Sequence, residues 1–203
     1  MNFKNLLLSC LLLPLSGAVL FAEDSGIEAG RVGRAAALAS PPSRKAVREL
    51  LGMLNDSSAN VRAKACQSLG VQDHEKAAQP LENLLASDPD AKVRAAAAKA
   101  LGQLQCKSSS EPLKKALAGD QDENVRAASA IALGRLLDGK AIFAPLSLAL
   151  KDKSDTVRTA AATALGYEDG YAAGRLLTYL VLLDKNPDVR AAAAQALAMC
   201  CAN

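Results

Sequence analysis

Apolar and polar residues recur along the chain with a period of 32 residues. A Val-Arg pair begins at Val61, Val93, Val125, Val157 and Val189, and an alanine-rich run that ends in leucine follows each pair. In the first copy Val61, Ala65 and Leu69 are four residues apart, which places them on one face of an α-helix. Because so many positions repeat in one phase, the chain is predicted to be an array of one helical unit.

The residues around each run predict where its helix begins and ends. The position three before each valine holds a residue type that caps helix N-termini: Ser58, Asp90, Asp122, Ser154 or Asn186. Helices of about 12 residues, here termed B helices, are therefore predicted to begin near residues 59, 91, 123, 155 and 187. A glycine follows the terminal leucine in four copies, at Gly70, Gly102, Gly134 and Gly166, and is expected to end the helix in a left-handed conformation.

A second apolar pattern precedes each B helix and predicts a shorter partner, the A helix. It reads Val47, Leu50, Leu51 and Leu54 in the first copy and Leu176, Leu177, Leu180 and Val181 in the last. Neither helix can bury its apolar face alone, so the copies must stack on one another. The predicted fold is an all-α, right-handed α-solenoid of about five helix pairs over residues 43–201.

An aspartate and an arginine also recur in every copy. The aspartates are Asp56, Asp88, Asp120, Asp152 and Asp184, and the arginines are Arg62, Arg94, Arg126, Arg158 and Arg190. The order of aspartate, Val-Arg, alanine-rich helix and Leu-Gly resembles HEAT repeats, in particular the short HEAT-like repeats of phycobilisome lyases. This resemblance covers residues 43–201 and implies that the two columns form a structural ladder, within or between repeats. The even spacing favours such a ladder over a catalytic or metal site, which would need asymmetry.

The first 22 residues have the pattern of a secretory signal peptide. Lys4 precedes an apolar run over residues 6–13, and the small residue Ala22 is the expected cleavage point, with Ala18 as a second candidate. The run is too short and too broken for a membrane span. The mature chain is therefore predicted to be periplasmic or secreted from a bacterium, with no transmembrane span. A lipoprotein anchored through Cys10, or an uncut helix, is the alternative.

Residues 23–42 precede the regular copies. They contain one worn fragment, residues 34–38, followed by Pro41 and Pro42. This segment is interpreted as a linker or a degenerate N-terminal cap that is partly disordered.

Composition argues against several enzyme and binding classes. The chain has 24 lysines and arginines against 21 acidic residues, a net charge of +3, and five of the arginines belong to the ladder, so nucleic acid is not an expected partner. The deoxyhypusine hydroxylases are HEAT-like solenoids with several His-Glu pairs, whereas His74 is the single histidine here. No metal or other cofactor and no enzymatic activity are predicted. Bilin lyase activity is kept only as a minor alternative, because an export signal separates the chain from cytoplasmic antennae.

Cysteines and aromatic residues add two expectations. Cys66 shares its column with alanines and is predicted to be a buried small residue, whereas Cys106 and Cys200 lie too many repeats apart for a disulfide. A disulfide between two chains through Cys200 or Cys201 stays open.

The mature aromatic residues, Phe143, Tyr167, Tyr171 and Tyr179, all fall in the last two repeats. They are interpreted as larger side chains that pack the end of the solenoid, with a binding patch as the alternative.

These observations favour an exported, non-enzymatic protein-binding module or scaffold that uses a concave face lined by B helices. Alanine columns, including Ala95, Ala96, Ala127 and Ala128, are expected to form a bland exposed stripe on that face. The larger residues that rise from it are the predicted contacts: Lys99, Gln103, Ile131, Arg135 and Tyr167. The alternative is a structural or regulatory subunit of an envelope complex. The partner and the oligomeric state stay open.

Overall fold

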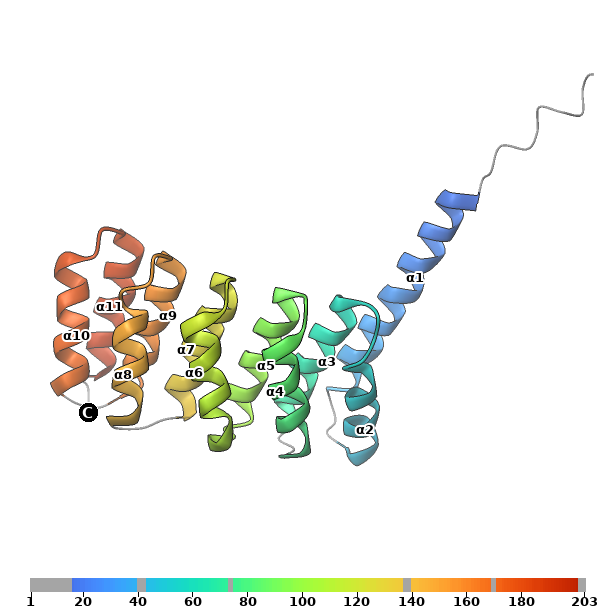
Figure 1. The fold of residues 1–203 in the computed structure, drawn as a ribbon, viewed down its shortest axis with the longest axis horizontal. Coiled ribbons are helices and arrows are strands. Elements are labelled where there is room, and N and C mark those ends of the chain that lie inside the picture. Colours follow the sequence, from blue (N-terminus) through green and yellow to red (C-terminus); the bar gives the residue numbers. More distant parts are fainter. Residues whose placement is uncertain (1–15, 40–42, 73–74, 137–139, 169–170, 201–203) are drawn as a thin grey trace, which may run out of the picture.

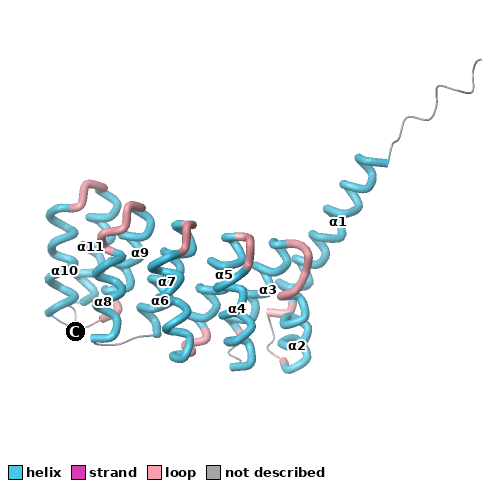
Figure 2. The backbone as a smooth tube through the Cα atoms, in the orientation of Figure 1, coloured by secondary structure: helices cyan, strands magenta, loops and turns pink. Residues whose placement is uncertain are grey.

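A computed structural model of the chain describes residues 16–39, 43–72, 75–136, 140–168 and 171–200. These residues contain α-helices and two short 3-10 helices and no strand, and the helix pairs stack side by side along one axis (Figures 1 and 2). The A helices are α2 (Arg44–Met53), α4 (Ala78–Ser87), α6 (Ser110–Gly119), α8 (Lys140–Ala149) and α10 (Tyr171–Leu183). The B helices are α3 (Ala59–Val71), α5 (Ala91–Gln103), α7 (Glu123–Leu136), α9 (Asp155–Leu165) and α11 (Pro187–Cys200). The 3-10 turns Glu75–Ala77 and Lys107–Ser109 lead into α4 and α6. The fold is an α-solenoid.

The B helices begin at the residues that the capping pattern indicates. The side chain of Asp90 accepts a hydrogen bond from the backbone N–H of Lys92 at 2.7 Å, and Asp122 and Asn186 accept equivalent bonds. Ser154 stands at the same position but donates its hydroxyl to Glu123 in the preceding B helix instead. The capping column therefore both starts helices and joins neighbouring repeats.

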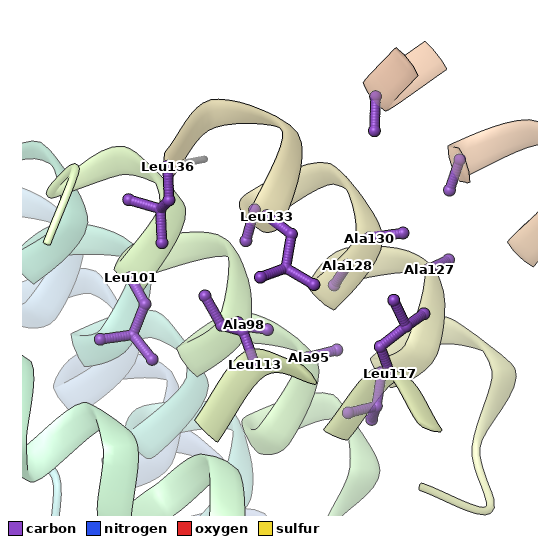
Figure 3. Close-up of a cluster of buried hydrophobic side chains, with 14 of the residues drawn as sticks. Ala95, Ala98, Leu101, Leu113, Leu117, Ala127, Ala128, Ala130, Leu133 and Leu136 are labelled. Atoms are coloured by element: carbon purple, nitrogen blue, oxygen red, sulfur yellow. The ribbon is translucent and has the colours of Figure 1, made fainter. Parts of the chain in front are cut away.

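The core is one continuous cluster of leucine, valine and alanine. The leucine column of the B helices is fully buried in the first four copies, and Leu113 of α6 is fully buried beside Leu101 and Leu133 (Figure 3). Neighbouring B helices pack along much of their length, whereas neighbouring A helices touch at few residues. The B helices are thus the more closely packed row, and the side that they line is here termed the concave side.

The glycine column does not end the B helices in a left-handed conformation, so that expectation was wrong, although α9 does end just before Gly166. Gly102 lies within α5, and Gly166, the residue after α9, has a right-handed backbone with φ −67°. A Cβ atom on Gly102 would lie 2.8 Å from the Cα of Ala132 in the next B helix, and one on Gly134 would lie 2.9 Å from the Cα of Ala164. Glycine is thus needed because neighbouring B helices approach closely.

An additional helix, α1 (Ser16–Ala37), precedes the five pairs and inclines away from the array in Figure 1. Residues 23–37, for which a loose linker or worn cap is the expectation, lie in this helix, and its C-terminal part packs against α3. Ala35 is fully buried, and its carbonyl accepts a hydrogen bond of 2.7 Å from the Ser68 hydroxyl. Gln72 donates to the carbonyls of Leu38 and Ala39. The segment therefore covers the first repeat.

The structure describes only part of the predicted signal peptide. The predicted cleavage point at Ala22 lies inside α1, and the candidate anchor Cys10 lies outside the described residues. None of the helices in the described part of the chain combines the length and apolar character that a membrane crossing requires.

Candidate functional site

The first four ladder arginines each reach forward to the aspartate of the next repeat. Arg94 donates from Nε and Nη2 to the two carboxylate oxygens of Asp120 at 2.7 and 2.9 Å. Its Nη1 donates to the carbonyl of Asp88, at the start of its own repeat, at 2.9 Å. The same arrangement joins Arg62 to Asp88, Arg126 to Asp152 and Arg158 to Asp184. The ladder therefore runs between repeats, and every step has the same direction.

The ladder groups are mostly buried and ionised. Arg126 and Arg158 are each only 6% exposed. The hydrogen bond from Arg94 holds the pKa of Asp120 below the ordinary aspartate value of 3.8, and Arg126 lowers the pKa of Asp152 in the same way. Both oxygens of each paired carboxylate are occupied, so these acids have a structural role and are poorly placed for acid–base chemistry.

The two ends of the ladder differ. At the N-terminal end Asp56 meets Arg31 of α1, with Nε and Oδ2 3.4 Å apart. At the C-terminal end Arg190 donates from Nη1 to the carbonyls of Asp184 and Lys185. No acidic partner for Arg190 is found within the part of the chain that the structure describes.

The alanine stripe is not the exposed surface that the sequence suggests. Ala95, Ala96, Ala127 and Ala128 are all at least nine-tenths buried, because neighbouring B helices cover them. The larger predicted contact residues do lie on the open side of the B helices: Lys99, Gln103, Arg135 and Tyr167 are exposed, and Ile131 is half-buried. The concave face thus consists of these larger side chains above tightly packed alanines.

A groove of about 1060 Å³ lies where α1 faces the B helices. It runs from α1 across α3 and α5 to the first residues of α7, and its lining includes Asn60, Lys64, Gln67, Lys92, Lys99 and Asn124. Glu28 of α1 accepts hydrogen bonds from Ser58 and Asn60, which lower the pKa of its carboxyl. Lys99 is the single predicted contact residue in this lining. Sequence reasoning missed the groove because its outer wall is α1.

The aromatic residues of the last repeats do not pack the end of the solenoid, so that interpretation was wrong. Tyr167, Tyr171 and Tyr179 are exposed, and Phe143 is half-buried. A second groove, of about 720 Å³, lies between α10 and α11, and Tyr171, Tyr179, Leu182 and Leu197 contribute to its apolar lining. The alternative interpretation, a binding patch, therefore keeps its structural basis.

The remaining candidate residues from the sequence are the cysteines and the single histidine. Cys66 is fully buried, as predicted, and burial raises the pKa of its thiol to about 12. Cys66 and Cys106 are free thiols and Cys200 is buried, while Cys201 and His74 lie outside the described residues. Within the described ranges no three histidine, cysteine or acidic side chains gather in a way that could hold a metal ion.

Comparison with known proteins agrees with this geometry. A family profile described as HEAT repeats matches residues 23–102, 80–166 and 110–198. No curated protein sequence matches the chain. Among solved structures, YibA of Escherichia coli is 26% identical with a TM-score of 0.58, and the match covers 74% of this chain and 57% of YibA. The chain thus spans less than two thirds of that protein.

Two further solved structures share the fold. The complex of CpcE and CpcF of phycocyanin lyase from Nostoc is 23% identical with a TM-score of 0.58, over 89% of this chain and 71% of that one. A designed armadillo repeat protein in complex with the peptide (KR)4 is 18% identical with a TM-score of 0.54, over 92% and 95% of the two chains. At these identities the likeness concerns the fold alone.

Proposed function

Since this chain belongs to the HEAT-repeat family, we propose that it is a scaffold that binds a protein partner along the concave side of its B helices. The observation that carries this proposal is the groove between α1 and the B helices. Its lysine, asparagine and glutamine side chains stand on helices that the ladder and the glycine column hold in a fixed arrangement. Preorganised polar side chains above a rigid floor are suited to a polypeptide ligand.

The contact surface is proposed to continue from Lys99 along the exposed edge of the B helices, through Gln103, Ile131, Arg135 and Tyr167. Arginine and tyrosine commonly contribute most of the energy of a protein interface. A scaffold fits the described acidic groups better than an enzyme does, because the ladder and capping carboxylates are already hydrogen-bonded within the chain. Complexes of CpcE with CpcF and of the designed armadillo protein with a peptide agree with this use of the fold.

Site-specific photocrosslinking tests this proposal. A photoreactive residue replaces Lys99 or Arg135 on the concave side, or Lys115, an exposed lysine of α6 on the opposite side, as a matched control. Irradiation in intact cells should give the same discrete protein adduct from the two concave positions and none from the control. Adducts from the position of Lys115 alone, or from none of the three, would rule out a concave binding face.

We further propose that the scaffold acts outside the cytoplasm, as the pattern of residues 1–22 supports. The mature chain should then begin at Glu23, which keeps residues 23–37 and with them the wall of the groove. N-terminal sequencing of the protein purified from its natural host decides between Glu23, a lipid-modified Cys10 and an uncut Met1. Either of the last two would contradict the proposed cleavage.

A further inference from the structure

The lysines of the B helices gather in one place. Helices α3 and α5 carry three of them, Lys64, Lys92 and Lys99, whereas α7, α9 and α11 carry none. All three line the groove between α1 and the B helices. The positions equivalent to Lys64 in the later repeats hold alanine instead: Ala96, Ala128, Ala160 and Ala192. Lysine on a B helix is therefore confined to this groove.

The ammonium groups of these lysines are available to a ligand. Lys92 and Lys99 are exposed, and Lys64 is half-buried. None of the three side chains forms a hydrogen bond or an ion pair with a residue that the structure describes. Lys92 and Lys99 are seven residues apart in α5, which places them on one side of that helix, about 10 Å apart along its axis. Lys64 lies on α3, which packs against α5, so the three charges act on one space.

The acidic residues of the same lining already have partners within the chain. Glu28 of α1 accepts hydrogen bonds from two side chains at the start of α3. Asp90 and Asp122 accept hydrogen bonds of 2.7 and 2.8 Å from backbone N–H groups at the starts of α5 and α7, where their charges offset the positive helix ends. The lining holds as many acids as lysines, but the lysines are the charges without a counterpart. The groove therefore favours an anionic ligand.

The rest of the lining suits a polypeptide better than a purely ionic ligand. Ala29 and Val32 of α1 form an apolar wall, and the small side chain of Ala95 leaves space at the floor. Gln67 and Asn124 are exposed and offer both hydrogen-bond donors and acceptors, as a peptide backbone requires. The groove crosses from α3 over α5 to α7, and because packed helices lie about 10 Å apart, about six residues of extended chain would span it.

We propose that the groove binds an acidic, extended segment of the partner protein. This inference rests on the proposed scaffold function and adds the chemistry of the partner. Carboxylates of the segment pair with Lys64, Lys92 and Lys99. Gln67 and Asn124 form hydrogen bonds with its backbone, and the wall of α1 contacts the apolar parts of its side chains.

A binding titration with defined peptides tests the proposal. The probe is a fluorescent ten-residue peptide that alternates glutamate and serine, so that all glutamates lie on one side of an extended chain. Fluorescence anisotropy with the full-length protein should show saturable binding that weakens as the salt concentration rises. Peptides with glutamine or lysine in place of glutamate should bind at least about tenfold more weakly. Absence of saturable binding, or equal binding of the glutamate and glutamine peptides, would overturn the proposal.

Two triple variants of the protein locate the binding. The groove variant carries Lys64→Gln, Lys92→Gln and Lys99→Gln, and it should lose about tenfold or more in affinity for the glutamate peptide. The control variant carries the same change at three exposed lysines outside the groove: Lys45, Lys115 and Lys151. It removes the same net charge and should bind nearly as the parent does. Equal losses in both variants would overturn the proposal, because net charge alone would then explain the binding.

The wall of α1 offers a test in both directions. Ala29 is exposed and lines the groove, so a longer side chain there is accommodated. Ala29→Lys should strengthen binding of the glutamate peptide about threefold or more, and Ala29→Glu should weaken it by a similar factor. No difference between these two variants would place the peptide outside the groove and contradict the proposal.

Other occupants are distinguished by two further measurements. A six-nucleotide oligothymidine carries the same five negative charges as the peptide; equally tight binding of it would overturn the proposal, because the groove would then recognise charge alone. Self-association in sedimentation velocity that the groove variant abolishes would also overturn it, since a second copy would be the occupant. A photocrosslinked protein adduct from position 99, combined with no preference for the glutamate peptide, would refute the acidic partner and leave the scaffold function in place.

Discussion

Replacing Gly102 by alanine tests whether the glycine column exists to let B helices approach one another. Alanine is the better helix former, so Gly→Ala inside an open helix stabilises by up to about 1 kcal/mol. At Gly102 the added Cβ would lie 2.8 Å from both the Cα and the Cβ of Ala132. These atoms belong to the backbone or are attached directly to it, so no side-chain rotation can relieve the contact.

The expected magnitude follows from these two opposing terms. Overpacking a dense core costs about 1–3 kcal/mol, and a contact against backbone belongs in the upper part of that range. After subtraction of the helix-propensity gain, Gly102→Ala should destabilise the protein by about 1–2 kcal/mol. For a chain of this size that corresponds to a melting temperature roughly 2–8 °C lower.

The matched control is Gly52→Ala. Gly52 is helical and exposed, and a Cβ there meets no atom within 4 Å. Thermal and urea unfolding followed by circular dichroism at 222 nm should show a small gain for Gly52→Ala and a loss for Gly102→Ala. Ala132→Gly should recover part of that loss, because it removes one of the two close atoms. Equal stabilisation by both alanine variants, or no coupling between positions 102 and 132, would refute the reasoning.

Three further predictions concern the ladder and the buried thiol. Arg126→Ala should destabilise the protein by about 2 kcal/mol more than Arg190→Ala, because only the first leaves a carboxylate without its partner; equal urea midpoints would contradict this. The ladder lowers the folded-state pKa of Asp120, so its stabilisation is complete above about pH 4 and is lost as the pH falls through the lowered value; Asp120→Asn should flatten the acid limb of a stability–pH curve. Cys66 should resist a thiol reagent at pH 8 that modifies the half-buried Cys106, as peptide mass spectrometry can measure.

The sequence predicts the repeating unit well because each unit obeys local rules. Capping residues mark the starts of the B helices, and the leucine and valine columns mark the buried stripe, so the period and the helix pairs follow from the chain itself. The resemblance to HEAT repeats implied a ladder but left open whether its pairs lie within or between repeats. The choice depends on whether the side chain of Arg94 reaches the next repeat. The sequence of a single repeat does not contain that information.

The errors on the alanine stripe and the glycine column share one physical cause, which is that a B helix has neighbours on two sides. A helical wheel with one buried stripe places Ala95 and Ala96 outward, but the B helices on the two sides of α5 bury them. A glycine that follows a leucine suggests a left-handed helix end. Close approach of neighbouring B helices requires glycine at the same position for a different reason. The fifth copy of the repeat indicates that the glycine serves helix packing. Its Ala198 replaces glycine in the one repeat that has no B helix after it among the described residues, and it is exposed.

The N-terminal helix escaped prediction because its pattern is shifted by one residue. Arg31 and Asp56 are 25 residues apart, whereas Arg62 and Asp88 are 26 apart, so a strict 32-residue register misses the pair. Three glycines, Gly26, Gly30 and Gly33, further weaken its helical signal.

The ladder gives the solenoid a direction, and the position of the concave groove is connected with it. Each of the first four ladder arginines binds the aspartate of the layer after it, so the aspartate of the first layer needs a cation before it. Arg31 of helix α1 supplies this cation to Asp56. The same helix forms the wall of the concave groove.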